Sequence, residues 1–587
     1  MPLYSKWGEA VNLAAPLPEY PRMTLQRNSF YNLNGEWEYQ ILQPRQMPVD
    51  NHWKKIVVPF ALGCALSQTN DVLMPGEVLW YRKVFRYRPE KKHTLLNFEA
   101  VDQRCEVYLN GHRIGSHDGG YTPFSIEATN FLEETNELLV SVIDDSDESA
   151  YAYGKQRIRH GGMWYAPTSG IWQTVWLEDV GDQAILDINV KIGFDERKVT
   201  LYLRGLFDKA KVIVSHDGRV VYEGIAQEKK HEFILADPHP WTPDDPFLYD
   251  LFIQTEDDLA KSYFGFRKFS RRVDKNGFPR FCLNNKPLFF TGLLDQGYSV
   301  DGMYTYPSDG AITYELGKIK DMGFNMLRKH VKVECRRWYY HCDRLGILVM
   351  QDMPNGAGPY DLLTTKYLPN IIGFTKMDDH DNPRLGRDDP EEQKIYYHEL
   401  DEMIATLSGY TSIFCWVAFN EGWGQFEGPE VTEHIRSLDD TRLIDTASGW
   451  HDQGCGDFYS RHMYFSSNIV PKRLDHRILI LSEFGGYSYL DPAHSEATKL
   501  YGYRKYKDKE EMDAAFHRFY DEVIIPSIRE GLSGCIYTQV ADVGDECNGL
   551  FTADRKVIKV NEEKTRTLNE RCIRRLRTTR LMSQEDR

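Results

Sequence analysis

SIFCWVAFNEGWG, residues 412–424, is an apolar run of strand length that ends in Asn420, Glu421 and glycine. ILILSEFGG, residues 478–486, ends in Glu483 and glycine in the same way. Continuous apolar runs are typical of parallel strands that are buried on both faces of a sheet. The two stretches therefore predict a parallel sheet in which two strands each end in a glutamate.

Six more strand candidates lie around these two, separated in several places by amphipathic helical stretches such as residues 312–323 and 513–531. Strands that alternate with helices indicate βαβ units, and eight such units within about three hundred residues are typical of a (β/α)8 barrel. We therefore predict a TIM barrel over residues 276–587. The six candidates are PLFFTGLLD (287–295), FNMLRKH (324–330), ILVMQDM (347–353), LIDTASGW (443–450), FYSRHMY (458–464) and GCIYTQVAD (534–542).

The residues before the barrel have the pattern of two β-sandwiches. Short alternating segments such as GEWEYQILQ (35–43) and CEVYLNGHRIG (105–115) are separated by turn signals, so residues 1–180 predict a jelly-roll domain. Segments such as KVTLYLRGLF (198–207) continue at the strand spacing of an immunoglobulin-like sandwich, which we place at residues 181–275. The sequence therefore predicts three domains.

Polar side chains follow several of the predicted barrel strands where each strand ends. Reactive groups of such barrels gather at the C-terminal ends of the strands, so we expect Glu421 and Glu483 to share one pocket. A charge that follows a fully apolar strand needs a partner or a function. The other strand-end residues that we expect to bind substrate or to support the glutamates are Asn420, Arg328, His330, His462 and Tyr464.

Two carboxyl groups about 5 Å apart can cleave a glycosidic bond with retention, one as proton donor and one as nucleophile. Trp423 gives Glu421 an apolar neighbour that favours its protonated form, so Glu421 is assigned as the proton donor. Tyr464 and Arg328 favour ionisation of Glu483, which is assigned as the nucleophile. Asn420 is expected to hold the substrate 2-hydroxyl.

Weaker signals lie around the predicted mouth of the barrel. Asp295 and Gln296 are placed to bind sugar hydroxyls, with a hydrogen-bond network of the rim as an equal alternative. Trp450 has the character of a sugar-stacking ring, with sealing of the core as its alternative. Residues 355–390 are rich in Gly, Pro and Asp and predict a long loop over the mouth, with a substrate lid as one interpretation.

Bulk properties narrow the class of protein. The formal charge of −16 argues against nucleic acid and, more weakly, against an anionic substrate. The ten cysteines show no metal-ligand spacing, and no apolar stretch has the length of a membrane helix. We therefore expect a cytoplasmic protein without cofactor or required metal, acting on a small oligosaccharide or glycoside, with no nucleic-acid or membrane partner and with a homo-oligomer left open.

The order of several motifs resembles glycoside hydrolase family 2, the group of β-galactosidases, β-glucuronidases and β-mannosidases. The resemblance spans about residues 15–560, and its motifs include LNGEWEY (33–39), VYLNGHRIG (107–115), TSGIWQTVWLE (168–178), HPWTPDDPFLY (239–249), AFNEGWG (418–424) and SEFGG (482–486). It implies a jelly-roll domain, an immunoglobulin-like domain and a catalytic barrel. It also implies Glu421 as acid/base and Glu483 as nucleophile, with His330, Asn420, His462 and Tyr464 at substrate-contacting or supporting positions.

The sequence departs from the family at two places. Thr538 and Gln539 stand where many members carry a tryptophan platform, and Gln539 is counted here among the substrate-binding residues. The Asn-x-Lys pair of β-glucuronidases is replaced in VGDECNGLF (543–551) by Glu546 and Asn548. We therefore expect a retaining exo-β-glycosidase for neutral sugars, first a β-galactosidase. The alternatives are a β-glucuronide, β-mannoside or arabinopyranoside substrate, and a carbohydrate-binding protein without turnover.

Overall fold

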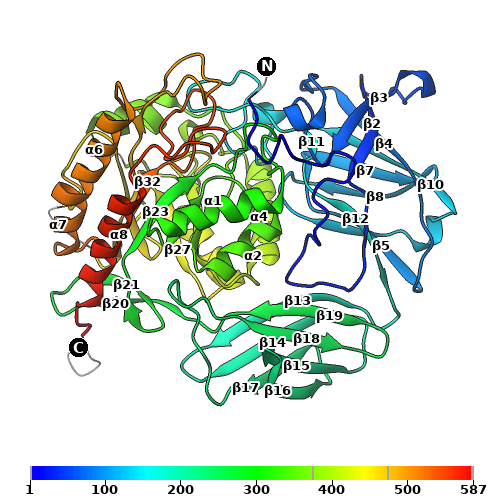
Figure 1. Ribbon diagram of the computed structural model, residues 1–587, viewed down its shortest axis with the longest axis horizontal. Helices are drawn as coiled ribbons and strands as arrows, with labels where there is room; N and C mark the ends of the chain where they lie inside the picture. Colours follow the sequence, from blue (N-terminus) through cyan, green and yellow to red (C-terminus); the bar gives the residue numbers. More distant parts are fainter. Residues whose placement is uncertain (1–2, 373–375, 472–474, 583–587) are drawn as a thin grey trace.

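The computed structural model describes residues 3–372, 376–471 and 475–582, and it divides into three parts (Figure 1). An N-terminal sandwich and a second, smaller sandwich both lie beside a barrel that is built from the rest of the chain. This is the architecture of jelly roll, immunoglobulin-like sandwich and TIM barrel that the sequence predicts.

Two antiparallel sheets form the N-terminal sandwich. In β10 (Thr135–Ile143), Leu138, Val140 and Val142 are completely buried and alternate with half-buried residues, as expected for a strand with one face on a core. The six-stranded sheet has the order β3 (Lys54–Val58), β2 (Gly35–Leu42), β4 (Val78–Arg86), β10, β7 (Arg104–Leu109), β8 (His112–Asp118), and the four-stranded sheet β1 (Tyr31–Asn32), β12 (Val175–Val180), β5 (His93–Phe98), β9 (Phe124–Glu127).

The second sandwich also consists of two antiparallel sheets. Its core contains Val199, Leu201 and Leu203 from alternate positions of one strand, facing Val212 and Val214 of the other sheet. The sheets have the orders β13 (Ile185–Gly193), β14 (Lys198–Gly205), β17 (Lys230–Ile234) and β16 (Arg219–Ala226), β15 (Ala210–His216), β18 (Tyr249–Gln254), β19 (Leu259–Phe264).

Eight parallel strands form the barrel, and all eight predicted strands are confirmed. Their hydrogen-bonded order is β27 (Leu443–Ser448), β26 (Ile413–Asn420), β25 (Leu348–Asp352), β24 (Met326–Lys329), β23 (Phe290–Asp295), β32 (Gly534–Thr538), β29 (Ile478–Gly485) and β28 (Phe458–Met463). Strands β27 and β28, at the two ends of this order, adjoin each other and nearly close the sheet. The C-terminal ends of the strands therefore surround one opening.

Helices cover the outside of the barrel. Most begin at a side chain that caps a free backbone N–H, as Ser308 does for α1 and Asp508 for α6. The main helices are α1 (Asp309–Asp321), α2 (Arg336–Leu345), α4 (Pro390–Leu407), α5 (Gly428–Leu438), α6 (Lys509–Phe519), α7 (Ile525–Ile528) and α8 (Glu562–Arg577).

Aromatic rings close the N-terminal end of the barrel. The small sheet of β20 (Phe269–Val273), β21 (Pro279–Leu283) and β22 (Lys286–Pro287) places Phe281 below the strands. Its ring lies 5.0 Å from that of Phe414 and 5.6 Å from that of Phe290. Because this end is filled with apolar side chains, access to the barrel interior is from the opposite end.

The segment after β25 is more ordered than the predicted loop. It contains a π-helical turn (Leu363–Tyr367) followed by α3 (Leu368–Ile372), and Pro369 is the second residue of α3; residues 373–375 lie outside the described part. Trp450 Nε1 donates to the Thr365 carbonyl at 3.1 Å, which ties the segment to the barrel mouth. No described helix is long and apolar enough to cross a membrane.

Candidate functional site

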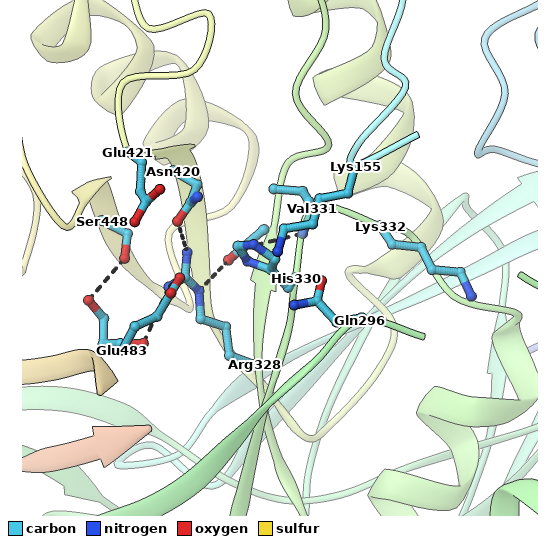
Figure 2. A network of polar contacts seen from close by, with 12 residues as sticks. Lys155, Gln296, Arg328, His330, Val331, Lys332, Asn420, Glu421, Ser448 and Glu483 are labelled. Carbon is cyan, nitrogen blue, oxygen red and sulfur yellow. Dashed lines mark hydrogen bonds and ion pairs between the residues drawn. The ribbon is translucent and has the colours of Figure 1, made fainter. Parts of the chain in front are cut away.

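Glu421 lies at the end of β26 in a constrained turn. Its φ of +53° is in the left-handed region, which costs a non-glycine residue about 1–3 kcal/mol and is often found at functional sites. The Glu421 N–H donates to the Ser448 carbonyl at 2.9 Å, and Trp423 N–H closes the turn on the Asn420 carbonyl. The turn therefore aims the Glu421 carboxyl into the barrel opening, where Figure 2 shows it above Glu483.

Glu483 lies near the end of β29 beside the buried guanidinium of Arg328. Arg328 Nη1 donates to Glu483 Oε1 at 3.1 Å, and its Nη2 donates to Asn420 Oδ1 at 2.9 Å. The third side of the guanidinium donates to Asp352 Oδ1 at 2.9 Å. Tyr464 OH donates to the other oxygen of Glu483. The nucleophile candidate is thus held by two donors, as Figure 2 shows for Arg328.

His462 lies between the two glutamates. Its Nδ1 is 2.9 Å from Glu421 Oε1, and its Nε2 is 3.5 Å from Glu483 Oε1. One oxygen of each carboxyl group lies within 4.8 Å of the other. A spacing of about 5 Å fits a retaining glycosidase, whereas an inverting enzyme needs several ångströms more to admit water.

The surroundings move the pKa values of the two glutamates in opposite directions. Burial raises the pKa of Glu421, and the hydrogen bond from His462 offsets only part of that effect. Burial acts on Glu483 as well, but the electrostatic effects of His462 and Arg328 and the hydrogen bond from Tyr464 outweigh it and hold its pKa below the usual range. The arrangement therefore favours a protonated Glu421 and an ionised Glu483, which are the forms of an acid and a nucleophile.

A bell-shaped pH profile is the expected consequence. Turnover should rise with pH as Glu483 ionises, at a pKa below the usual glutamate value, and fall as Glu421 loses its proton, at a pKa above that value. The measurement is kcat/KM on a nitrophenyl glycoside across the pH range. In Glu421→Ala the basic limb should disappear, and a wild-type profile without a basic limb would contradict the assignment.

Arg328 is the structural centre of the site, and its removal should be costly. Arg328→Met would leave the buried carboxylates of Glu483 and Asp352 without their shared cation, so we expect a loss of about 3–5 kcal/mol of unfolding free energy. The acid limb of the pH profile should also move upward. Urea unfolding measures the loss of unfolding free energy. Arg328→Lys is the control, because lysine keeps the positive charge but cannot donate to several partners at once as the planar guanidinium does.

The structure brings five of the other predicted residues to this pocket. Arg328 and Tyr464 contact Glu483, His462 contacts Glu421, and Asn420 and His330 complete the wall. Within the described residues, the side-chain nitrogen of Asn420 has no hydrogen-bond partner, so a donor beside Glu421 remains free. His330 pairs with Asp352 at 2.9 Å, and burial lowers its pKa far below the usual value, so the ring is neutral.

The residues predicted on weaker signals have mainly structural contacts. Asp295 is 2 % exposed and forms an ion pair with Lys329 at 2.6 Å, so its charge is used inside the protein. Trp450 is 1 % exposed and donates to the carbonyl of Glu421 at 3.0 Å, which supports the turn and leaves no open ring face for stacking. Gln296 donates to Gln539 Oε1 at 2.7 Å, and both residues are buried.

Sequence patterns missed two contributors to the site. Lys155, from the N-terminal sandwich, is drawn with the network around His330 in Figure 2. Tyr503, from the segment after β29, stacks on Tyr464 with ring centroids 3.6 Å apart. Neither follows a barrel strand, and so the strand-end rule could not find them. The only signal for Lys155 was its position shortly before the RHGGMWY motif at residues 159–165.

Metal-binding geometry is limited to two groups within the described residues. One is the cluster of Glu421, His462 and Glu483, and the other is His380 and Asp381 on the segment that follows residue 375 together with Glu427, just before α5. The first is the pair of glutamates with the histidine between them. The second consists of two exposed residues and one half-buried residue.

Family models match most of the chain. Residues 67–195 match the glycosyl hydrolase 2 galactose-binding domain-like model, residues 171–267 a glycosyl hydrolases family 2 model, and residues 275–487 the family's TIM barrel domain. The chain belongs to glycoside hydrolase family 2. Its three matches follow the same order as the sandwich, the second sandwich and the barrel.

Curated relatives of this family 2 chain carry two different activity names. A putative β-glucuronidase of Formosa agariphila is 25% identical over 391 residues, which cover 64% of this chain and 34% of that protein. A β-galactosidase of Thermoanaerobacter pseudethanolicus is 26% identical over 454 residues, which cover 72% of this chain and 56% of that protein. The chain thus spans about a third and just over half of these two relatives.

Solved structures share the whole architecture. A β-D-glucuronidase of Dictyoglomus thermophilum superposes with a TM-score of 0.72 at 19% identity, covering 94% of this chain and 98% of that one. A β-galacturonidase of Eisenbergiella tayi bound to galacturonate gives a TM-score of 0.69 at 18% identity, with 94% and 99% covered. At these identities the likeness shows the fold.

Proposed function

We propose that the protein is a retaining exo-β-glycosidase in which Glu421 is the acid/base and Glu483 is the nucleophile. The observation that carries this proposal is the pair of carboxyl groups within 4.8 Å of each other, with pKa values displaced in opposite directions. That combination matches the needs of a double displacement on an anomeric carbon.

The reaction has two steps. Glu483 attacks the anomeric carbon while Glu421 gives its proton to the departing glycosidic oxygen, so an ester of the sugar with Glu483 forms as the aglycone leaves. Glu421, now ionised, takes a proton from water, whose oxygen attacks the same carbon and releases Glu483. The sugar leaves with the configuration it had in the substrate, because each step inverts it once.

The neighbouring side chains have roles that follow from their contacts. Arg328 and Tyr464 keep Glu483 ionised and fix the position of its oxygens. The free amide nitrogen of Asn420 is a donor for the sugar hydroxyl next to the anomeric carbon, a contact that strengthens in the transition state. His462 holds the Glu421 carboxyl in place through its Nδ1.

The segments around the barrel mouth support the exo mode. An arm of the N-terminal sandwich, residues 150–166, reaches the barrel, where Gly162 N–H donates to Asp545 at 3.1 Å. Tyr501 N–H donates to the Asp545 carbonyl at 2.9 Å, so the segment after β29 joins the same rim. The ring centroids of Trp164, on the arm, and Trp423 are 5.2 Å apart. With the arm and the segment after β29 joined at the mouth, a terminal sugar is a better candidate for the substrate than the middle of a chain.

Two sugar classes are candidates for that pocket. A neutral β-galactoside agrees with the name of one relative and with the absence of the Asn-x-Lys pair, whereas a β-uronide agrees with the names of other relatives. The test is a panel of nitrophenyl β-glycosides that includes galactoside, glucuronide, galacturonide, mannoside and arabinopyranoside. Proton NMR of the first product reports its configuration. Binding without release of nitrophenol, or an inverted product, would refute the proposal.

A further inference from the structure

We propose that Lys155 and Glu546 form a specificity pair in the sugar pocket, which binds hydroxyl groups of a neutral sugar and disfavours a sugar carboxylate. This inference rests on the glycosidase function proposed above. It explains the class of sugar that the enzyme accepts by two residues, one from the N-terminal sandwich and one from the barrel.

The arm holds Lys155 firmly against the barrel. Backbone N–H groups of Tyr153 and Gly154 donate to the Asn355 carbonyl at 2.9 and 3.0 Å, just after β25. Tyr165 N–H donates to the Lys155 carbonyl at 2.9 Å and closes the arm on itself. Because the backbone on both sides of Lys155 is fixed, the arm itself needs no further ordering when a ligand binds.

The ammonium group of Lys155 has no hydrogen-bond partner among the residues that the structure describes. The residue is 6 % exposed, which is unusual for a lysine that is not fully paired. Its nearest opposite charge is Glu546 Oε2 at 3.6 Å, beyond hydrogen-bonding reach. The preceding Gly154 packs against the carbonyl of Val331, the residue after His330, and Figure 2 draws Lys155 with this part of the barrel mouth. The charge of Lys155 lowers the pKa of His330 and of Glu421, which agrees with this position. A buried cation with free donors points to a polar ligand.

Glu546 supplies the matching acceptor. It is 3 % exposed, and one oxygen accepts a hydrogen bond from Tyr165 OH, which leaves the other without a hydrogen bond in the described part of the chain. The amide nitrogen of Gln539 and both amide atoms of Asn548 are likewise buried without partners there. Gln539 N–H donates to the Asn548 carbonyl at 3.2 Å, so these groups lie together at the end of β32. The site therefore has free donors and acceptors side by side.

Charge decides which sugar suits this pair. A hydroxyl group both donates and accepts, so it can accept from Lys155 while it donates to Glu546. A carboxylate can only accept, and near Lys155 it would also lie near the like charge of Glu546, which repels it in a buried site. The pair is therefore complementary to a neutral sugar and selects against a uronide.

The test compares wild type, Lys155→Met and Glu546→Gln on nitrophenyl β-galactoside, β-glucuronide and β-galacturonide. Wild type should prefer the neutral glycoside. Lys155→Met should lower kcat/KM on it by about 100-fold, because Glu546 is left buried and unpaired. Glu546→Gln should raise the ratio of uronide to neutral activity by about 100-fold, because it removes the repulsion.

Monodeoxy analogues of the preferred glycoside separate a binding role from a structural one. Deletion of the hydroxyl that Lys155 contacts should be costly in wild type and nearly neutral in Lys155→Met, a coupling that misfolding does not produce. Arg159→Met, which removes an exposed cation of the same arm, is the matched control and should behave as wild type. If Lys155→Met does not fold, Glu546→Gln still tests the charge argument.

The outcomes distinguish this inference from the proposed function. A wild-type enzyme that prefers uronides and loses that preference in Lys155→Met would overturn the inference and leave the glycosidase intact. An unchanged uronide to neutral ratio in Glu546→Gln would also overturn it. Absence of turnover on every glycoside in the panel would instead remove the proposed function.

Discussion

Glu483→Ala is expected to lower kcat/KM on every glycoside by roughly 10⁵-fold, in the range found when a covalent nucleophile is removed from an enzyme. The ester with the sugar cannot form without this carboxylate, and no other ionised group in the pocket has its hydrogen bonds from Arg328 and Tyr464. The folded state should not suffer, because the change removes one of two carboxyl groups that lie within 4.8 Å of each other. Thermal unfolding measured beside kcat/KM checks both statements.

Azide identifies the role of Glu483 independently of the size of the loss. In Glu483→Ala a small anion can occupy the space of the missing carboxylate and attack the anomeric carbon once, so the product is the α-glycosyl azide from a β-glycoside. Glu483→Gln is the matched control, because its amide fills the space and should prevent rescue. A β-glycosyl azide from Glu483→Ala would exchange the roles of the two glutamates.

The fold could be predicted from the sequence because its signals are local. Each barrel strand is a run of apolar residues bounded by polar or glycine residues, and the run 412–420 corresponds closely to β26, Ile413–Asn420. Each sandwich strand alternates with period two, as in β10. The segment after β25 was less predictable, because its Gly, Pro and Asp content indicates a loop, whereas a π-helical turn and a short helix form there and Trp450, which is distant in sequence, donates a hydrogen bond to Thr365.

The site residues that lie at the ends of barrel strands could be predicted from the sequence. Glu421, Glu483 and Arg328 come from three strands whose C-terminal ends the barrel brings together. Lys155 was not predictable in this way, because it is 173 residues before Arg328 in the sequence and reaches the site only through the docking of one domain on another. Trp450 and Asp295 show the converse, since strand-end residues can also serve the scaffold through hydrogen bonds and ion pairs.

Glu421→Ala is expected to lose activity in a manner that depends on the leaving group. A substrate with a poor leaving group, such as a disaccharide, needs the proton that Glu421 supplies, so its kcat/KM should fall by about 10²–10⁴-fold. The aglycone of a dinitrophenyl glycoside leaves as the stable dinitrophenolate anion, so the first step on this substrate should be almost unaffected. Release of the sugar from Glu483 should then become slow, and a burst of dinitrophenol should precede the steady state.

Azide again separates this role from a general loss of structure. In Glu421→Ala it can attack the ester on Glu483 without a base, so turnover of the dinitrophenyl glycoside should rise and the product should be the β-glycosyl azide, by two inversions. Glu430→Ala, which removes an exposed glutamate of the first turn of α5 just beyond the Glu421 turn, is the matched control and should retain full activity on both substrates. Equal losses of kcat/KM on the disaccharide and the dinitrophenyl glycoside would show that Glu421 does not donate the proton, since only proton donation makes the loss depend on the leaving group.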